Sequence, residues 1–315
     1  MRVIFAGSGE FGLPTLEALQ QAHEIVGVIT QPDRPAGRKR KPRATPIGAW
    51  ADERGLPTFK ADNVNEPDFI AAIAALQPDA SVVIAFGQKL SPQIIDAMGK
   101  LTVNLHASLL PKYRGAAPIN WAIMRGERET GVSVIALAQR MDAGDVYGQI
   151  ATPIDPNETA GELHDRLATL GPAAVLGVLD QLATDTLSPQ PQTHAKATKA
   201  PKLSREDGRL LFDRPAAEVV RQIHGLTPWP GCRAIWRRAD GSEVAPLLIR
   251  RAAVVDATHH KSPGTLLDNP LHVAAGDGVF EMLEIQPAGG RVMAARDFAN
   301  GRDLRTGDQL TTPAE

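Results

Sequence analysis

A chain of 315 residues with 43% apolar and 22% charged residues has the composition of a globular protein, which excludes a disordered or fibrous one, and its length favours two domains. The formal net charge of −2 excludes a uniformly basic surface, so any nucleic-acid binding has to rest on local clusters of cations. Cys232 is the only cysteine, which excludes an intrachain disulfide and a metal site built from several thiolates.

The N-terminal segment has the pattern of a β-strand rather than that of a signal peptide. MRVIFAGSGEFG carries one arginine and a short apolar run before glycine and glutamate appear. No stretch of the chain approaches the roughly 18 apolar residues that a membrane-spanning helix needs. The expected location is therefore the cytoplasm, without membrane association.

The first half of the chain alternates between short β-branched runs and helical patterns. We expect strands over 2–6, 24–30, 80–86 and 102–106, with helices over 14–22 and 66–76 between them. Such alternation is typical of an α/β fold with a doubly wound, mostly parallel sheet.

Three glycines follow the first expected strand. Gly7, Gly9 and Gly12 fit the spacing G-x-G-x-x-G, which is typical of dinucleotide-binding folds when an acidic residue ends the second strand. Here the second strand runs into Gln31 and Pro32 instead. A tight strand-to-helix turn that needs glycine is therefore favoured, and nucleotide binding is the alternative.

A run of cations comes next. Six of them, with no acidic residue among them, lie between residues 34 and 43: Arg34, Arg38, Lys39, Arg40, Lys41 and Arg43. Gly37 and the two prolines, Pro35 and Pro42, argue against a helix. Composition alone leaves a solvated loop and a nucleic-acid contact equally open.

The strongest functional pattern is NLHASLLPKYRGAAPINW, from Asn104 to Trp121. Asn104 and His106 lie two positions apart at the end of an expected strand, so their side chains project from the same face of the sheet. The ends of parallel strands are where open α/β sheets bind ligands. A lone buried Asn or His is usually a core residue, but this pair suits a carbonyl oxygen that gains negative charge during acyl transfer.

A second element spans residues 131–149, GVSVIALAQRMDAGDVYGQ, in which two strand-like runs flank a turn containing Asp142 and Asp145. A carboxylate in this turn could orient His106 or relay a proton. Taken alone, Asp-Ala-Gly-Asp is usually only a turn.

The second half of the chain begins with a helical pattern. Thr159 and Glu162 have the spacing of a capping box, and the apolar stripe after them predicts one long helix up to Leu182 that closes the first domain. Residues 186–203 are rich in Pro, Thr, Gln and Lys, which predicts a linker.

Beyond this segment, a helix near 215–225 precedes short strand-like runs separated by Gly, Pro and Asp, which predicts a small β-barrel. We therefore expect domains over 1–185 and 204–315, joined by a linker over 186–203. Cys232 beside Gly231, with His224 as a base, would be a weak candidate nucleophile, because a lone cysteine next to a Pro-Gly turn is more often a packing residue.

Several of these segments together closely resemble the folate-dependent formyltransferases. The resemblance rests on the pattern that begins at Asn104, the later Asp-Ala-Gly-Asp, the early QPDRPAGR, and the late TPWPG (227–231) and FANGRDLRTGDQL (298–310). It implies a Rossmann-like catalytic domain followed by a domain like the oligonucleotide-binding (OB) fold. It also implies transfer of a formyl group from 10-formyltetrahydrofolate to an amino group, with no metal required.

Carried over residue by residue, the resemblance implies Asn104, His106 and Asp142 as catalytic residues, and Ser108, Leu109, Leu110 and Pro111 as a folate-contacting turn. The cationic run from Arg34 to Arg43 resembles the loop that lies against the acceptor end of tRNA in this family. The resemblance therefore implies initiator methionyl-tRNA as the partner, with a monomer as the default state. An amino sugar nucleotide or glycinamide ribonucleotide is the alternative acceptor, and a tRNA-binding module without catalysis is disfavoured by the intact trio.

Overall fold

The computed structural model describes residues 1–36 and 41–313. The chain forms two compact units that interleave along the sequence. Unit 1 comprises Met1–Gly115, Thr130–Thr152 and His164–Lys199, and unit 2 comprises Ala116–Glu129, Pro153–Leu163 and Ala200–Glu315. The domains expected from the sequence are continuous ranges, whereas each of these units is made of three separate segments of the chain.

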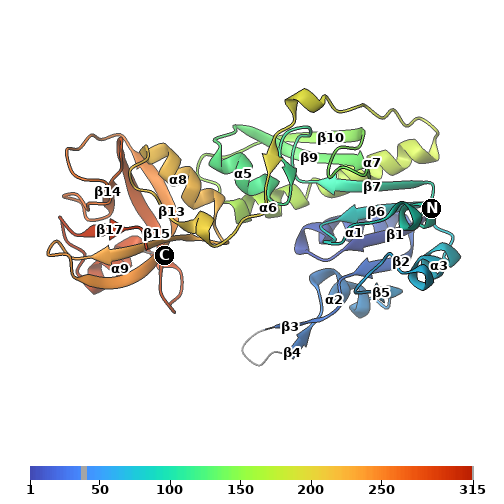
Figure 1. Ribbon diagram of the computed structural model, residues 1–315, viewed down its shortest axis with the longest axis horizontal. Coiled ribbons are helices and arrows are strands. Elements are labelled where there is room, and N and C mark those ends of the chain that lie inside the picture. The colour runs from blue at the N-terminus through green and yellow to red at the C-terminus, as the bar shows by residue number, and fades with distance from the viewer. Residues whose placement is uncertain (37–40, 314–315) are drawn as a thin grey trace. The chain divides into compact units, whose positions relative to one another are not determined.

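Unit 1 is built on a seven-stranded sheet with the order β10-β9-β7-β6-β1-β2-β5 (Figure 1). The strands are β1 (Arg2–Gly7), β2 (Glu24–Thr30), β5 (Thr58–Lys60), β6 (Ala80–Ile84), β7 (Leu101–His106), β9 (Glu129–Ala136) and β10 (Val146–Pro153). The pairs β1–β2, β1–β6, β2–β5 and β6–β7 are parallel, and β7–β9 is antiparallel. The mostly parallel sheet expected from the sequence is confirmed.

Helices cover both faces of this sheet, as expected for a doubly wound fold. They are α1 (Leu13–Ala22), α2 (Pro46–Glu53), α3 (Pro67–Ala75), α4 (Pro92–Ala97) and α7 (Gly171–Ala183), with the 3-10 turns η1 (Glu10–Gly12) and η2 (His194–Lys196). Ile4 packs in one cluster with Ile73 of α3 and Ile94 of α4. On α7, a Cβ at Gly171 would meet Thr15 of α1 and Leu105 of β7.

The glycine turn after β1 serves close packing. A Cβ at Gly7 would lie 2.6 Å from the Phe5 ring and 2.7 Å from the carbonyl oxygen of Ile84, and one at Gly12 would lie 2.9 Å from the same ring. These distances leave no room for a side chain, which confirms the expected tight strand-to-helix turn.

The prediction of a single long helix up to Leu182 is wrong, because two helices occupy this region. α6 (Ala160–Ala168) ends before Thr169, and α7 begins at Gly171 with Pro172 in its first turn. Proline lacks an N–H, and its ring would clash with the carbonyl four residues earlier, so it stops α6 and starts α7. The capping box is present, because Glu162 accepts from the Thr159 N–H at 2.8 Å.

Unit 2 contains the predicted small barrel. Its strands are β12 (Cys232–Arg237), β13 (Glu243–Val255), β14 (His272–Ala274), β15 (Val279–Pro287), β16 (Met293–Ala294) and β17 (Gln309–Thr311). They form an antiparallel sheet in the order β14-β15-β13-β12-β17, with β16 beside β15. Thr265 pairs with Gln309 and Leu266 with Val273, so one short segment bridges the two edge strands.

The helices of unit 2 are α5 (Pro118–Met124), α8 (Ala216–Gly225) and α9 (Ala295–Arg302), with the 3-10 turn η3 (Glu206–Gly208). Two further short strands, β8 (Arg114–Gly115) and β11 (Lys199–Ala200), pair with each other. Asn120 of α5 donates to the Gly225 carbonyl at 2.7 Å, which fixes α5 against α8. Among the described residues, no helix is both long and apolar enough to cross a bilayer.

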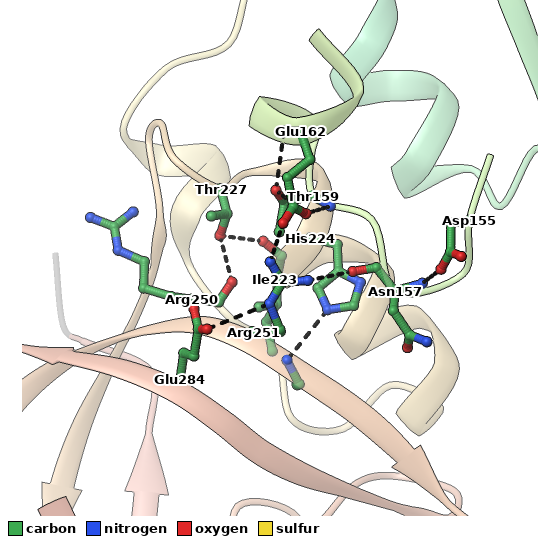
Figure 2. Close-up of polar contacts among 11 residues, drawn as sticks. Asp155, Asn157, Thr159, Glu162, Ile223, His224, Thr227, Arg250, Arg251 and Glu284 are labelled. Carbon is green, nitrogen blue, oxygen red and sulfur yellow. Dashed lines mark hydrogen bonds and ion pairs between the residues drawn. The ribbon is translucent and has the colours of Figure 1, made fainter. Parts of the chain in front are cut away.

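Arg251 on β13 joins the segment before α6 to the barrel (Figure 2). Its guanidinium donates to the Asn157 carbonyl at 2.7 Å and forms an ion pair with Glu162 at 2.5 Å. Burial by itself raises the pKa of Glu162, but hydrogen bonds from Thr159 and Arg251 outweigh it and hold that pKa at about 2. The carboxylate therefore stays charged and keeps this segment on the barrel.

His224 lies beneath the same segment and is 1% exposed. Its Nε2 accepts from the Ala252 N–H at 3.3 Å, and the ring has a second hydrogen bond with the Pro156 backbone, whose carbonyl accepts from the other nitrogen. Burial lowers the pKa of His224, and nearby Arg251 lowers it further. The ring is thus a neutral imidazole with both nitrogens bound to the backbone.

Candidate active site

Asn104 and His106 occupy the last part of β7, where the parallel part of the sheet meets antiparallel β9. Asn104 pairs with Ile135, and His106 with Ser133. His106 is 6% exposed, whereas Asn104 is half-buried. The amide of Asn104 makes no side-chain hydrogen bond with any residue in 1–36 or 41–313, so it is available to a ligand.

The ring of His106 is held by one nitrogen. Its Nε2 lies 2.9 Å from the Tyr113 carbonyl oxygen, which can only accept a hydrogen bond, so Nε2 carries a proton. In the neutral ring, Nδ1 is then the nitrogen that carries no hydrogen. It faces the Oδ2 of Asp142 at 3.7 Å, which is longer than a direct hydrogen bond.

Asp142 is brought to His106 by the turn between β9 and β10. Its side chain is 14% exposed, and its Oδ2 accepts from the Gly115 N–H at 2.8 Å. This backbone donor fixes the carboxylate oxygen that faces the imidazole. The structure therefore brings His106 and Asp142 together, and Asn104 projects from the same face of β7.

The turn of Asp142 is also held by residues that sequence reasoning did not single out. The amide nitrogen of Gln192 donates to the carbonyl oxygens of Asp142 and Gly144, at 2.9 and 2.6 Å. The side-chain oxygen of Gln192 accepts from Arg114. No sequence signal identifies Gln192, because it lies 50 residues from Asp142 in a segment rich in Pro, Thr and Gln.

The turn Ser108–Pro111 follows β7 directly and is closely packed. The buried Ser108 hydroxyl donates to the Lys112 carbonyl at 2.7 Å, and the Leu110 N–H donates to Ser133 at 3.1 Å. These polar groups are satisfied within the protein. What the turn leaves available to a ligand is apolar surface on the half-buried Leu109 and Pro111.

A cavity of 320 Å³ in unit 1 adjoins this turn and is lined by Leu110, Pro111, Val146, Tyr147, Gly148, Gln149, Gln190, Pro191, Gln192 and Thr193. Gln149 donates across it to the Leu110 carbonyl at 3.0 Å and to Ser133 at 2.8 Å. Burial raises the pKa of Tyr147, and nearby Asp145 raises it further, so this phenol is neutral.

The described residues of the cationic run form two short paired strands, called the hairpin below. β3 (Arg34–Ala36) pairs with β4 (Lys41–Arg43) in antiparallel register, which places Arg34 opposite Arg43. Arg34 forms an ion pair with Asp62 at 3.2 Å, and Lys41 and Arg43 are exposed. The remaining predicted cations, Arg38, Lys39 and Arg40, lie outside the described residues.

Cys232 lies in the core of unit 2, and burial raises the pKa of its thiol far above the usual range. A thiol held protonated is a poor nucleophile. Since His224 uses both ring nitrogens on the backbone, the packing role expected for Cys232 fits the geometry.

The sequence matches two known families and a curated relative over nearly its whole length. The family described as formyl transferase matches residues 1–179, and that described as formyl transferase, C-terminal domain, matches residues 202–303. A methionyl-tRNA formyltransferase from Solibacter usitatus (strain Ellin6076) is 39% identical over 312 residues, which cover 98% of each chain.

Solved structures share the fold at low identity. WlaRD, a sugar 3N-formyl transferase solved in the presence of dTDP and 5-N-formyl-THF, has a TM-score of 0.68 at 16% identity, covering 92% of this chain and 99% of that one. HypX from Aquifex aeolicus, solved in complex with tetrahydrofolic acid, has a TM-score of 0.60 at 18% identity, covering 95% of this chain and 47% of that one.

Proposed function

This chain belongs to the formyl transferase family, and we propose that it transfers a formyl group from 10-formyltetrahydrofolate to the free amino group of initiator methionyl-tRNA. The product would be the N-formylated initiator used in translation. The observation that carries the proposal is the approach of the Asp142 carboxylate to Nδ1 of His106 at 3.7 Å. Asn104, whose amide has no side-chain partner among the described residues, lies two residues before His106 on the same face of β7.

The donor set fits a formyl group. The amide of Asn104, which has no side-chain partner among the described residues, suits a carbonyl oxygen on which negative charge develops. The imidazole on the same face of β7 suits the proton that the attacking amine releases. The turn Ser108–Pro111, expected to contact folate, would do so through the apolar surfaces of Leu109 and Pro111, because its polar groups are used internally.

In the proposed mechanism, the neutral α-amine of methionyl-tRNA attacks the formyl carbon. 10-Formyltetrahydrofolate supplies the formyl group already activated, so no metal is needed. Asn104 donates its amide N–H to the formyl oxygen. His106 keeps Nε2–H on the Tyr113 carbonyl, and its Nδ1, together with Asp142, accepts the proton of the amine through an ordered water. The bond between the formyl carbon and N10 of the folate then breaks, and N10 takes up the proton so that tetrahydrofolate leaves.

The exposed hairpin is the part of unit 1 best suited to tRNA. Arg34 and Arg43 are directly paired across β3 and β4, and like charges in such pairs destabilise a sheet. A polyanionic backbone would relieve this repulsion. We therefore assign phosphate contacts to the cationic run, including Arg38, Lys39, Arg40 and Lys41.

Replacing Arg38, Lys39, Arg40 and Lys41 with alanine tests this role. The KM for tRNA should rise, its dependence on salt should become shallower by about 1 in the log–log slope for each lost phosphate contact, and folate affinity should not change. The control is Lys100→Ala, an exposed cation elsewhere in unit 1. Unchanged tRNA kinetics at moderate salt would exclude the hairpin from the interface.

A substrate comparison tests the function itself. The purified chain is incubated with 10-formyltetrahydrofolate and, in parallel, initiator methionyl-tRNA, elongator methionyl-tRNA or a dTDP-linked amino sugar, and formylated product is measured by chromatography. We expect rapid formylation of the initiator only. Formylation of the amino sugar but not of the tRNA would replace this proposal with that of a sugar N-formyltransferase.

A further inference from the structure

The turn that carries Asp142 has a backbone that needs outside support. Asp142 has a φ of +52°, in the left-handed region that side-chain-bearing residues rarely adopt. A Cβ at Gly144 would lie only 1.9 Å from the Ala136 carbonyl oxygen, so the turn presses against β9. A carboxylate on such a turn keeps its place only if surrounding groups fix the main chain.

Gln192 supplies that support. It is 8% exposed, and its amide nitrogen donates to the carbonyl oxygens of Asp142 and Gly144, which lie on either side of Ala143 in the turn. The two hydrogens of one amide thus hold two carbonyls in fixed relation to each other. Opening the turn would leave both carbonyls without this donor, so the arrangement resists opening.

Arg114 fixes the orientation of this amide. Its Nε and Nη2 donate to the Gln192 oxygen at 3.1 and 2.6 Å. Because the guanidinium can only donate, the oxygen of Gln192 must face Arg114 and the nitrogen must face the turn. Gly115, next in the chain, donates its N–H to the Asp142 carboxylate. The segment Arg114–Gly115 therefore holds Asp142 directly and, through Gln192, holds its main chain.

We propose that Gln192 is a positioning residue of the formyl transfer reaction, which keeps the Asp142 carboxylate facing Nδ1 of His106. This inference rests on the function proposed above. Gln192 acts through the turn, because its amide nitrogen bonds the main chain of the turn and not the Asp142 carboxylate. Outer partners that orient a functional group in this way typically change activity by about 10–100-fold when removed.

Gln192→Glu is the sharpest variant, because its carboxylate still accepts from Arg114 but offers no N–H to the two carbonyls. We expect kcat to fall about 10–100-fold, with the KM for each substrate within about threefold of the original value. The matched control is Gln93→Glu, the same change at an exposed glutamine of α4 in unit 1, which does not line the cavity beside the turn. A merely structural role would lower the unfolding midpoint and leave the kcat of the folded protein unchanged.

A double-variant cycle tests whether the effect passes through Asp142. In the Asp142→Asn background, Gln192→Glu should cost no more than about twofold in kcat, because residues that act as a unit are not additive. A full additional loss would overturn the proposal. If Gln192→Glu does not fold, Gln192→Met, of similar length and without N–H groups, replaces it with the same expectations.

Amide hydrogen exchange at Gly115 gives a readout that needs no substrate. Its N–H is protected by the Asp142 carboxylate, so Gln192→Glu should speed its exchange while Gln93→Glu should not. If wild-type protein does not formylate methionyl-tRNA, the proposed function fails, and Gly115 exchange still decides the positioning. If wild-type protein is active but Gln192→Glu retains its kcat and its Gly115 protection, the positioning fails alone.

Discussion

His106 and His224 are both buried histidines, 6% and 1% exposed, and they differ in what their second ring nitrogen meets. His224 uses one nitrogen on the Ala252 N–H and the other on the Pro156 backbone. His106 uses one nitrogen on the Tyr113 carbonyl, and the other faces the Asp142 carboxylate across 3.7 Å.

This difference separates a structural histidine from a chemical one. A ring whose two nitrogens are both bound to the backbone cannot change protonation without breaking a hydrogen bond. A ring with one nitrogen left free of the backbone can exchange a proton with a ligand or a water without losing a structural hydrogen bond. Burial does not distinguish the two, whereas the partner of the second nitrogen does.

The largest expected effect lies at the His106 site. Asn104→Ala removes the donor to the formyl oxygen, and loss of one such donor costs about 10²–10³ in kcat. The fold should persist, because the Asn104 amide has no partner among the described residues. Steady-state kinetics with circular dichroism as the folding control measure this, and near-normal turnover would remove Asn104 from the mechanism.

His224→Ala should show the opposite pattern. It leaves a cavity and two unpaired backbone groups, so unit 2 should lose roughly 2–5 kcal/mol of stability. The kcat of the folded protein should be unchanged, because His224 is outside the proposed site. Urea unfolding followed by tryptophan fluorescence measures the first quantity, and a selective loss of kcat with full stability would reverse the assigned roles.

The pH dependence of stability should follow His224 as well. Its pKa is lowered in the folded protein from 6.5, so its contribution is complete above pH 6.5 and is lost as pH falls towards the folded value. The unfolding midpoint should therefore decrease below pH 6.5. The same series on His224→Ala should be flatter in this range, and identical slopes would contradict the neutral imidazole.

Glu162→Gln should have the smallest effect. The ion pair with Arg251 is partly exposed, so its loss should cost less than about 1 kcal/mol at neutral pH. Because the pKa of Glu162 is lowered from 4.5 to about 2, the contribution of the carboxylate is full above pH 4.5 and is lost as pH falls towards 2. The variant should lack this acid-dependent loss in urea unfolding.

Much of unit 1 could be predicted from the sequence because its strands are buried on both faces and read as continuous apolar runs. The spacing of Asn104 and His106 predicted that both side chains lie on one face of a strand, and the register of β7 agrees. The break between α6 and α7 was not predicted, although Pro172 cannot lie inside a helix, because the apolar stripe continues across it.

The support of the Asp142 turn was not predictable in the same way. Composition makes the segment around Gln192 resemble a linker, because a single buried amide leaves no periodic pattern. Likewise, the pairing of His224 with Ala252 depends on how α8 packs against β13, which no local spacing encodes. Long-range hydrogen bonds of single side chains are visible only in the folded structure.

The turnover of Asp142→Asn is the most direct test of the account, because this change keeps the shape of the side chain and removes the charge that faces His106. With saturating 10-formyltetrahydrofolate and initiator methionyl-tRNA, we predict a kcat at least about 10² lower than that of the wild type, with a native circular dichroism spectrum. A kcat within about threefold of the wild-type value would contradict the proposed role of Asp142.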